Sequence, residues 1–470
     1  MKVYDRLYGE YKFPAIIQEL LDCPGLLRLR DVRMANNQFV AFPAFASSSR
    51  YEHSLGVCHL AGLCATSLSL PEKDTIELMM ACLYHDVGTP PFAHAMEEVL
   101  QLAFGFDHEQ NLKNLIMGTT GKFDGDMARV FCDEGLKLRS VCHSKKGRTL
   151  GLDLYRIAKI AAGDGDEPFA PLLNGGGMDL DNIDNIIRAS SAMGIIQVED
   201  IDLASRLAHA FIFEEGHFYY DGNYISDIRR WQQIRDLQYT TIFNSLDDFS
   251  FQTMIKKSLN LLMHDPAASA RIDNNSWKLT DSSIVHDVLL ANPKSREIMK
   301  RVLLCKPFHC LGVLHIQGHN AARFLNEHLA EIERIASDYF KDALDIRQKK
   351  LNSIHTNPVV ANFYPDKRKR RLKNKAFSWN TETVIDEAID SPQGALLGLF
   401  TPFSNSNHRE VKGDDGKPLR KSVSFRKENL LELMKLLADD TLSRFCVSVY
   451  GSDSNGQPTT NATGNQLEFF

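Results

Sequence analysis

Two adjacent segments, residues 47–70 and 71–86, constrain the fold of this chain more than any other feature. The first opens with serines, which are good helix caps, and continues as an apolar run. The second begins at Pro71, a residue suited to a helix start, and ends at the adjacent pair His85-Asp86. The pattern therefore predicts two consecutive helices. A buried charged pair at the end of an apolar run is costly unless it is paired or holds a metal, so the pair indicates a site.

The rest of the chain is predicted to be mainly helical, with few strands. Residues 118–177 are rich in Gly, Asp and Lys and favour looser structure. The expected fold class is therefore mainly α, with a small α+β lobe near the C-terminus. Helices are expected at 13–33, 177–195, within 196–312 and at 427–440, and strands at 38–43 and 444–451.

Composition excludes several broad classes. With 43% hydrophobic and 24% charged residues, the chain is not globally disordered. A net charge of −6 argues against a protein built to coat nucleic acid. Nine cysteines without a CxxC pair favour reduced thiols and a cytoplasmic location. The N-terminus carries no apolar signal region, and no apolar run is long enough to span a membrane, so no membrane partner is expected.

Four residues on or beside three predicted helices could hold one metal: His53, His85, Asp86 and Asp181. Two imidazoles and two carboxylates suit Fe, Mn or Zn, with or without additional Mg, better than Ca. A lone His-Asp dipeptide is weak evidence. The Gly-containing turn after it, the second His beyond that turn, and the flanking His and Asp helices strengthen it. The alternative is that His53 and His85 are core histidines satisfied by backbone groups.

Several stretches resemble the HD-domain phosphohydrolases, and in particular their deoxynucleoside triphosphate triphosphohydrolase branch, which includes bacterial dGTPase-like proteins. The resemblance is specific to about residue 312 and returns weakly at 420–450. It implies an HD hydrolase core with an N-terminal regulatory segment over 1–312, an α+β lobe over 313–455, and a disordered tail over 456–470. The matching stretches are RYEHSLGV (50–57), HDVGTPPFAH (85–94), DHEQ (107–110), MDLDNIDNIIR (178–188) and WKLTD (277–281).

The resemblance implies roles for individual residues. The four candidate ligands would be the metal ligands, His108 and His94 would handle protons near the leaving group, and Arg50 would contact phosphate. Asp179 and Asp184, which flank Asp181, are expected to be outer or solvent residues. The implied activity is metal-dependent hydrolysis of a (deoxy)nucleoside triphosphate to nucleoside and triphosphate. Nucleotide depletion in antiviral defence is a further implication. The alternative for His94 and His108 is an exposed or capping histidine.

The positions that read the sugar depart from the family pattern. Met34 stands where the family has Gln, and Asn185 stands where it has Tyr; both are expected at the substrate. Ala189 replaces an Asp, and Thr89 replaces an active-site His. A buried polar side chain that hydrogen-bonds the sugar discriminates strongly between nucleotides, and a methionine does not do so in the same way. The resemblance therefore predicts the chemistry but leaves the identity of the nucleotide open.

An activator site between subunits is also implied by the resemblance. Lys2, Val3, Asp22 and Arg30 match positions that hold a guanine nucleotide, and Phe42 matches a neighbouring deoxynucleotide site. GTP or a dNTP would be the activator, and a homo-oligomer, dimer or tetramer, would be the active form. The alternative is that these residues are surface charges.

Two other functional classes stay open. One is an HD-type phosphodiesterase or nuclease acting on oligonucleotides or nucleotide second messengers. The other is a nucleotide or nucleic-acid sensor. The basic run at 366–375 could contact nucleic acid, but no aromatic residues alternate with its charges, so a solvated surface is favoured. The intact set of candidate ligands favours an enzyme over a sensor.

Overall fold

A computed structural model describes most of the N-terminal two thirds of the chain and selected strands beyond it. The residues described are 1–36, 41–118, 137–175, 177–239, 242, 245–263, 272–290, 292–317, 328–338, 360–365, 376–378, 381–383, 394–401 and 447–450.

The chain divides into two compact units that interleave in sequence. Unit 1 comprises Met1–Tyr239, Met263–Leu289 and Arg370–Ile389, and unit 2 comprises Thr240–Leu262, Leu290–Lys369 and Asp390–Phe470. This division differs from a single boundary after residue 312, because strand β5 (His309–Gln317) runs through that position. The end of the family resemblance therefore does not coincide with a loop between units.

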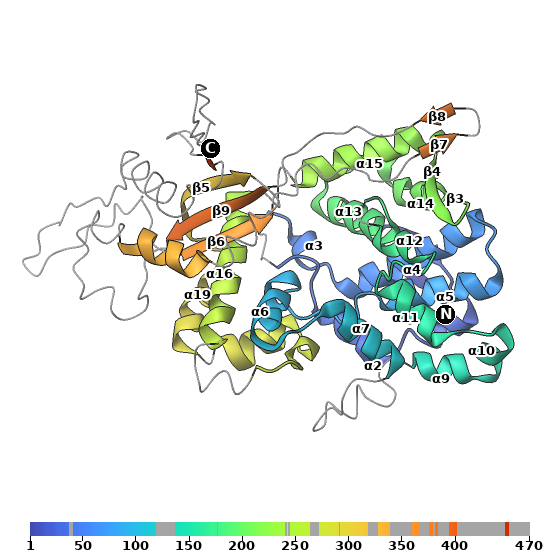
Figure 1. Cartoon of the computed structure of the whole chain (residues 1–470), viewed down its shortest axis with the longest axis horizontal. Coiled ribbons are helices and arrows are strands. Elements are labelled where there is room, and N and C mark those ends of the chain that lie inside the picture. The colour runs from blue at the N-terminus through green and yellow to red at the C-terminus, as the bar shows by residue number, and fades with distance from the viewer. Residues whose placement is uncertain are drawn as a thin grey trace, which may run out of the picture. The chain divides into compact units, whose positions relative to one another are not determined.

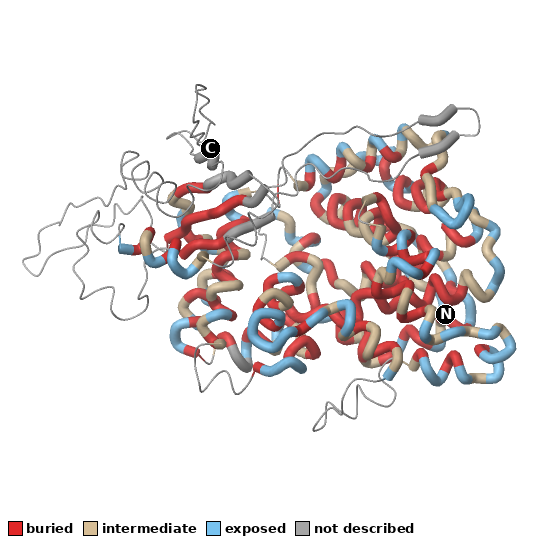
Figure 2. Tube along the Cα trace, in the orientation of Figure 1, coloured by how far each residue is buried: buried red, intermediate tan, exposed pale blue. Residues whose placement is uncertain are grey.

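Three buried helices form the core of unit 1: α4 (Arg50–Ser67), α5 (Glu72–Tyr84) and α13 (Leu180–Met193). Helix α4 packs against both α5 and α13, and all three are buried over much of their length (Figures 1 and 2). The two helices predicted from residues 47–86 are confirmed. The site residues lie where these three helices approach one another.

Local sequence explains where the core helices begin. Ser49 caps α4 as predicted: its Oγ accepts from the backbone N–H of Glu52, and the Glu52 carboxylate accepts from the N–H of Ser49. Asp179 caps α13 by accepting from the N–H of Asn182 at 2.8 Å. Asp179 is therefore a structural capping residue two positions before the candidate ligand Asp181.

The remaining elements of unit 1 surround this core. The looser structure expected over 118–177 is only partly observed, since short helices occupy much of the described portion. The hairpin of β3 (Phe211–Glu214) and β4 (His217–Asp221) lies where only helices were expected; its strands pair antiparallel, with Phe211 opposite Tyr220 and Phe213 opposite Phe218. The elements are β1 (Val3–Asp5), β2 (Gly9–Tyr11), α1 (Ala15–Gln18), α2 (Pro24–Arg28), η1 (Leu29–Asp31), α3 (Pro43–Ala46), α6 (His94–Phe104), α7 (His108–Met117), α9 (Leu138–His143), α10 (Lys145–Leu150), α11 (Leu154–Ala161), α12 (Ala170–Asn174), η2 (Val198–Asp200), α14 (Leu203–Ala208), β3 (Phe211–Glu214), β4 (His217–Asp221), η3 (Gly222–Tyr224), α15 (Ile225–Gln238), η5 (Ser276–Lys278), α18 (Asp281–Ser283), η6 (Ile284–Leu289), β7 (Ala376–Ser378) and β8 (Thr381–Thr383).

Unit 2 combines helices with an antiparallel sheet. Helices α16 (Leu246–Met263) and α19 (Pro293–Leu303) accompany strands β5, β6 (Val360–Pro365), β9 (Gly394–Thr401) and β10 (Val447–Tyr450). The strand order is β10-β5-β9-β6, and every pair is antiparallel. The expected fold class, a mainly α protein with a smaller α+β part, is therefore observed.

Other local predictions meet different outcomes. The strand expected at 444–451 corresponds to β10. Of the strand expected at 38–43, only residues 41–43 are described, and there Pro43 begins α3 instead. The basic run 366–375, the helix expected at 427–440 and the tail 456–470 lie outside the described residues. Within the described part of the chain, helices are too short or too polar to cross a membrane.

Candidate metal centre and active site

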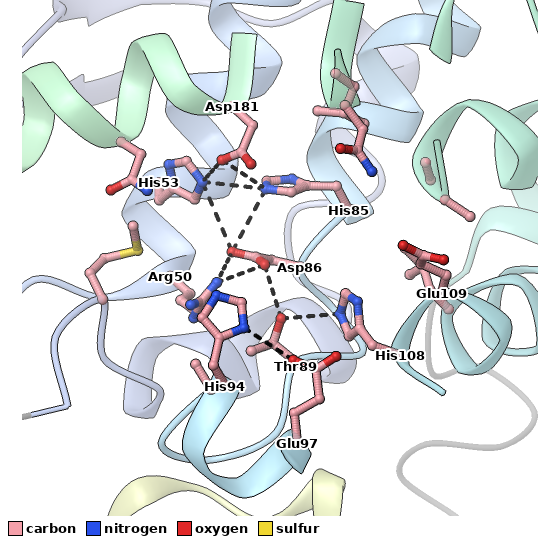
Figure 3. Close-up of a pocket in the computed structure, with 18 residues that line it drawn as sticks. Arg50, His53, His85, Asp86, Thr89, His94, Glu97, His108, Glu109 and Asp181 are labelled. Carbon is pink, nitrogen blue, oxygen red and sulfur yellow. Dashed lines mark hydrogen bonds and ion pairs between the residues drawn. The ribbon is translucent and has the colours of Figure 1, made fainter. Parts of the chain in front are cut away.

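Three donor side chains form the centre of the site: His53 of α4, His85 at the end of α5, and Asp181 of α13 (Figure 3). The Nε2 atom of His53 lies 2.8 Å from Oδ1 of Asp181 and 3.3 Å from Nε2 of His85. Nε2 of His85 lies 3.8 Å from the same aspartate oxygen. The three donor atoms all lie within 4.8 Å of one another, which suits a single small cation.

The other ring nitrogen of each histidine is already used. Nδ1 of His85 donates to the backbone oxygen of Cys82 at 2.8 Å, and Nδ1 of His53 donates to Oδ1 of Asp184 at 2.7 Å. Because a carbonyl and a carboxylate only accept, the Nε2 atom of each neutral imidazole carries a lone pair. Two such lone pairs 3.3 Å apart favour a positive charge between them. The nitrogen and oxygen donors therefore fit a first-row transition metal.

Electrostatics at His53 agree with this interpretation. Burial opposes a positive charge on the ring, yet its hydrogen bonds with Asp181 and Asp184 raise the pKa of His53 to about 10. Without a metal the ring would thus carry a proton on Nε2 at neutral pH, and the same field favours a metal cation in place of that proton.

Asp86, the fourth predicted ligand, lies at the edge of the donor cluster. Its Oδ2 atom is 3.7 Å from Nε2 of His85 and 4.0 Å from Nε2 of His53. Both carboxylate oxygens accept from Nη1 of Arg50 at 2.7 Å, and Oδ1 accepts from the Thr89 hydroxyl at 2.9 Å. Burial alone would raise its pKa, but Arg50 and the two histidines hold the pKa of Asp86 well below its usual range. Arg50, expected at a phosphate, contacts Asp86 here.

The two predicted proton-handling histidines differ in environment. Nε2 of His108, at the start of α7, lies 3.4 Å from the Thr89 hydroxyl, which connects it to Asp86. Burial lowers the pKa of His108. The side chain of His94, at the start of α6, is 83% exposed, and its Nδ1 lies 3.1 Å from a Glu97 oxygen. His108 is therefore the more sheltered of the two.

A cavity of about 340 Å³ opens beside the donor cluster. Met34 and Asn185, the expected substrate contacts, both line it, as do Thr89 and the unpredicted carboxylate Glu109. Its lining comprises Met34, Arg50, His53, His85, Asp86, Thr89, Ala93, His94, Glu97, His108, Glu109, Leu112, Ala161, Ala162, Leu173, Asn174, Asp181 and Asn185.

Arg28 anchors the loop that follows His85-Asp86. Its Nη2 donates to the backbone oxygens of Val87 and Thr89 at 3.0 and 2.7 Å. Its Nη1 donates to those of Trp277 and Leu279 at 3.0 and 2.9 Å. Burial lowers the pKa of Arg28 to about 10, so the side chain is still a cation at neutral pH. This arginine ties the motif loop to the segment at 277–279.

Asp281 holds the next stretch of the loop. Its carboxylate accepts from the backbone N–H groups of Phe92 and Arg33, both at 2.9 Å. Phe92 and Ala93 adopt positive φ values of 57° and 45°, which non-glycine residues seldom take. Strained backbone of this kind persists where surrounding contacts impose it, and here it positions the start of α6 at the cavity.

Asp184 occupies the outer position behind His53, which is one of the two positions expected for it. It is fully buried against His53, Arg188 and Tyr8. Its spacing was informative, because Asp184 lies three residues after Asp181 and four before Arg188, which places all three on adjacent faces of a helix. The contact with Tyr8 is separated by 176 positions and left no local signal.

The five proposed activator residues each have separate surroundings. Lys2 pairs with Glu10, and the exposed Asp22 pairs with Lys137 at 2.8 Å. The remaining three are placed as follows: Val3 lies in β1, the Arg30 guanidinium stacks over Tyr51 at 4.7 Å, and Phe42 is half-buried before α3. The activator site stays a prediction.

Comparisons with known proteins match the same region. The family model described as HD domain covers residues 50–130, which include α4 to α7. Over 117 residues the chain is 34% identical to the deoxynucleoside triphosphate triphosphohydrolase SAMHD1 homolog of Dictyostelium discoideum, covering 23% of each chain. Over 105 residues it is 35% identical to deoxynucleoside triphosphate triphosphohydrolase SAMHD1 of Bos taurus, covering 21% of this chain and 18% of that protein. The matched stretch thus spans less than a quarter of these relatives.

A solved structure extends the likeness of fold. The crystal structure of a hypothetical protein from Aquifex aeolicus superposes with a TM-score of 0.60 at 18% identity, covering 86% of this chain and 96% of that one. At this identity the likeness concerns the fold alone.

Residues 50–130 match the HD-domain model, and two of the three clustered donors, His53 and His85, lie within that stretch. Within that class, the matched region resembles the deoxynucleoside triphosphate triphosphohydrolases.

Proposed function

We propose that the chain is a metal-dependent hydrolase that converts a (deoxy)nucleoside triphosphate to nucleoside and intact triphosphate. The observation that carries the proposal is the pair of imidazole Nε2 atoms 3.3 Å apart, each with its Nδ1 committed to an acceptor. His53, His85 and Asp181 would hold the metal, with Asp86 as the fourth ligand. A bound metal would activate water and neutralise phosphate oxygens.

The chain's own residues have separate tasks in this proposal. Asp184 orients His53, and Arg50 keeps Asp86 ionised. His108, sheltered beside Thr89, would donate a proton to the leaving oxygen. His94 and Glu97, at the open side, would hold a proton near the substrate. Met34 and Asn185 would contact the nucleoside.

A second candidate, hydrolysis of a phosphodiester in an oligonucleotide or nucleotide second messenger, is supported by the charge of the cavity. The described lining carries the carboxylates of Asp86, Glu97, Glu109 and Asp181, against a single guanidinium, Arg50. A triphosphate brings several negative charges, whereas a phosphodiester link is singly charged and needs fewer cations.

Assembly and regulation complete the proposal. We infer a homo-oligomer activated by GTP or a dNTP bound near Lys2, Asp22 and Arg30. A nucleotide that binds the assembled form better than the free subunit raises both assembly and activity. The nucleotide chemistry is supported by the relatives, which are named deoxynucleoside triphosphate triphosphohydrolases. The activator and the oligomer rest on the sequence resemblance, and the proposed cytoplasmic location rests on the nine cysteines without a CxxC pair.

The deciding experiment identifies products by mass. The protein, loaded separately with Fe(II), Mn(II) or Zn(II), is incubated with each dNTP and NTP, with and without candidate activators, and with dinucleotides and cyclic dinucleotides. Nucleoside plus intact triphosphate supports the first candidate. Monophosphate products from dinucleotides, with triphosphates unchanged, support the second. Monophosphate plus pyrophosphate from a triphosphate contradicts the proposed cleavage position.

A further inference from the structure

The N-terminal hairpin reaches the metal centre through one hydroxyl. Tyr8, in the turn between β1 and β2, donates its hydroxyl to Oδ2 of Asp184 at 2.6 Å. The other oxygen of Asp184 accepts from Nδ1 of His53 at 2.7 Å. Tyr8 therefore lies two hydrogen bonds from the imidazole whose Nε2 atom faces Asp181 and His85.

Arg188 holds the same carboxylate from the opposite side. Its Nε and Nη2 atoms donate to the two oxygens of Asp184 at 2.8 and 2.9 Å. Its Nη1 atom lies 3.0 Å from Oδ2 of Asp5, and its guanidinium lies over the Tyr8 ring, 5.5 Å from the centroid. Asp5 also accepts from the backbone N–H of Tyr8 at 3.2 Å, so the same residues fix both the turn and the carboxylate.

The side chains of Asp184 and Arg188 are tightly enclosed, with little space to move. A Cβ atom at Gly56, three residues after His53 on α4, would lie 2.1 Å from Oδ2 of Asp184 and 2.3 Å from Nη2 of Arg188. The side chains of Asp184 and Arg188 are almost fully buried. A carboxylate held this closely has few alternative orientations. The loss of one of its hydrogen-bond donors therefore weakens its control over the orientation of the His53 ring.

We propose that Tyr8 is a positioning residue for the metal centre: through Asp184 it fixes the ring orientation of His53 and thereby raises the affinity of the site for its metal. The inference rests on the metal centre of the proposed function. Outer partners of a metal-binding histidine fix its tautomer and orientation, and their loss typically weakens metal binding by about 10–100-fold. The hairpin is thus part of the metal site although it contributes no ligand.

Tyr11 offers a matched control on the same hairpin. Its ring stacks on His59 with centroids 4.2 Å apart, and its buried hydroxyl has no hydrogen-bond partner among the described residues. Tyr11→Phe therefore removes a hydroxyl from the same structure without touching Asp184. A role for the hairpin in packing alone would make the two substitutions equivalent.

The test measures Co²⁺ binding by the full-length protein and the visible spectrum of the bound ion, with chelator competition to obtain affinity. Tyr8→Phe is expected to weaken Co²⁺ binding about 10-fold and to shift the spectrum, while Tyr11→Phe changes neither. In an Asp184→Asn background, Tyr8→Phe should have no further effect, because its action passes through that carboxylate. Thermal melting of each variant verifies folding.

Equal Co²⁺ affinity and spectrum in wild type and Tyr8→Phe would overturn the inference, as would equal weakening by Tyr8→Phe and Tyr11→Phe. The proposed metal centre is checked separately with His85→Ala. If that variant binds Co²⁺ as wild type does, the centre itself is wrongly assigned and the inference fails with it. If His85→Ala loses the metal and Tyr8→Phe does not, only the role of Tyr8 is refuted.

Discussion

At the residue scale, the two imidazoles that face each other give the sharpest prediction. His85→Ala removes one donor from a cluster in which each ligand atom lies within 4.8 Å of the others. We expect loss of stoichiometric metal by elemental analysis and loss of hydrolysis. His94→Ala is the control for metal content only, because its side chain is 83% exposed and lies outside this cluster. Retained metal in His85→Ala would refute the ligand assignment.

His108 tests the proton-donor role. His108→Gln should lower turnover by about 10²–10⁴-fold while leaving metal content unchanged. The reason is its position: it is sheltered, hydrogen-bonded to Thr89, and not part of the donor cluster. Steady-state kinetics and elemental analysis on the same sample check both parts. Near-normal turnover would leave His108 only a structural role at the start of α7.

The buried carboxyl of Asp248 in unit 2 is expected to make the free energy of unfolding depend on pH, independently of catalysis. Burial raises the pKa of Asp248 to about 8. The folded state therefore binds a proton that the unfolded state releases near pH ~3.9, so this stabilisation is full at low pH and is lost as pH rises toward 8.

Asp248→Asn removes that titration. Relative to wild type, we expect the variant to gain stability as pH increases from 4 to 8, with a limiting slope of about 1.4 kcal/mol per pH unit. Chemical denaturation at several pH values measures the difference. Asp247→Asn, at the exposed neighbouring position, should run parallel to wild type. Parallel curves for Asp248→Asn and wild type would show that the pKa of this carboxyl is not raised.

At the scale of elements, the contact between α4 and α13 depends on one glycine. Gly56→Ala would place a Cβ atom 2.1 Å from Asp184, so the helices must separate or the buried carboxylate must move. We expect a destabilisation of about 1–3 kcal/mol together with weaker metal binding.

Gly62, one and a half turns further along α4, is the matched control. A Cβ there meets only the flexible end of Met79 at 3.4 Å. Gly62→Ala should be neutral or stabilising by up to about 1 kcal/mol, because alanine favours helix. Denaturation midpoints compare the two variants. Equal midpoints would contradict the close approach of α4 and α13.

At the scale of the whole molecule, the proposed control by nucleotides depends on residues that lie on separate elements. Asp22 is exposed and pairs with Lys137. If Asp22 binds a purine at a subunit contact, Asp22→Ala should abolish nucleotide-dependent assembly while keeping the metal. Light scattering and activity are measured together across activator concentrations. Glu19→Ala, an exposed acid in the same segment, is the control; an enzyme fully active as a monomer would refute the site.

The sequence alone predicted the helices that carry the donors, because capping serines, Pro71 and apolar runs are local signals. It also predicted His53, His85, Asp86 and Asp181 as one ligand set, from their residue types and the resemblance to a known family; of these, His53, His85 and Asp181 lie in the donor cluster. It did not predict the contact between Arg50 and Asp86, or the difference in exposure between His94 and His108. Those depend on how side chains from separate segments compete for the same partners.

Only the tertiary structure decided which groups support the donors. Tyr8 meets Asp184 across 176 positions, and Arg28 joins the motif loop to residues 277–279. It also decided which distant segments join within unit 2, since β5 pairs with strands far along the chain. The residues that favour a helix, such as caps and apolar runs, act over one or two turns and can be recognised in adjacent sequence positions. Buried hydrogen bonds between distant segments depend on how the whole fold packs, so no local sequence pattern predicts them.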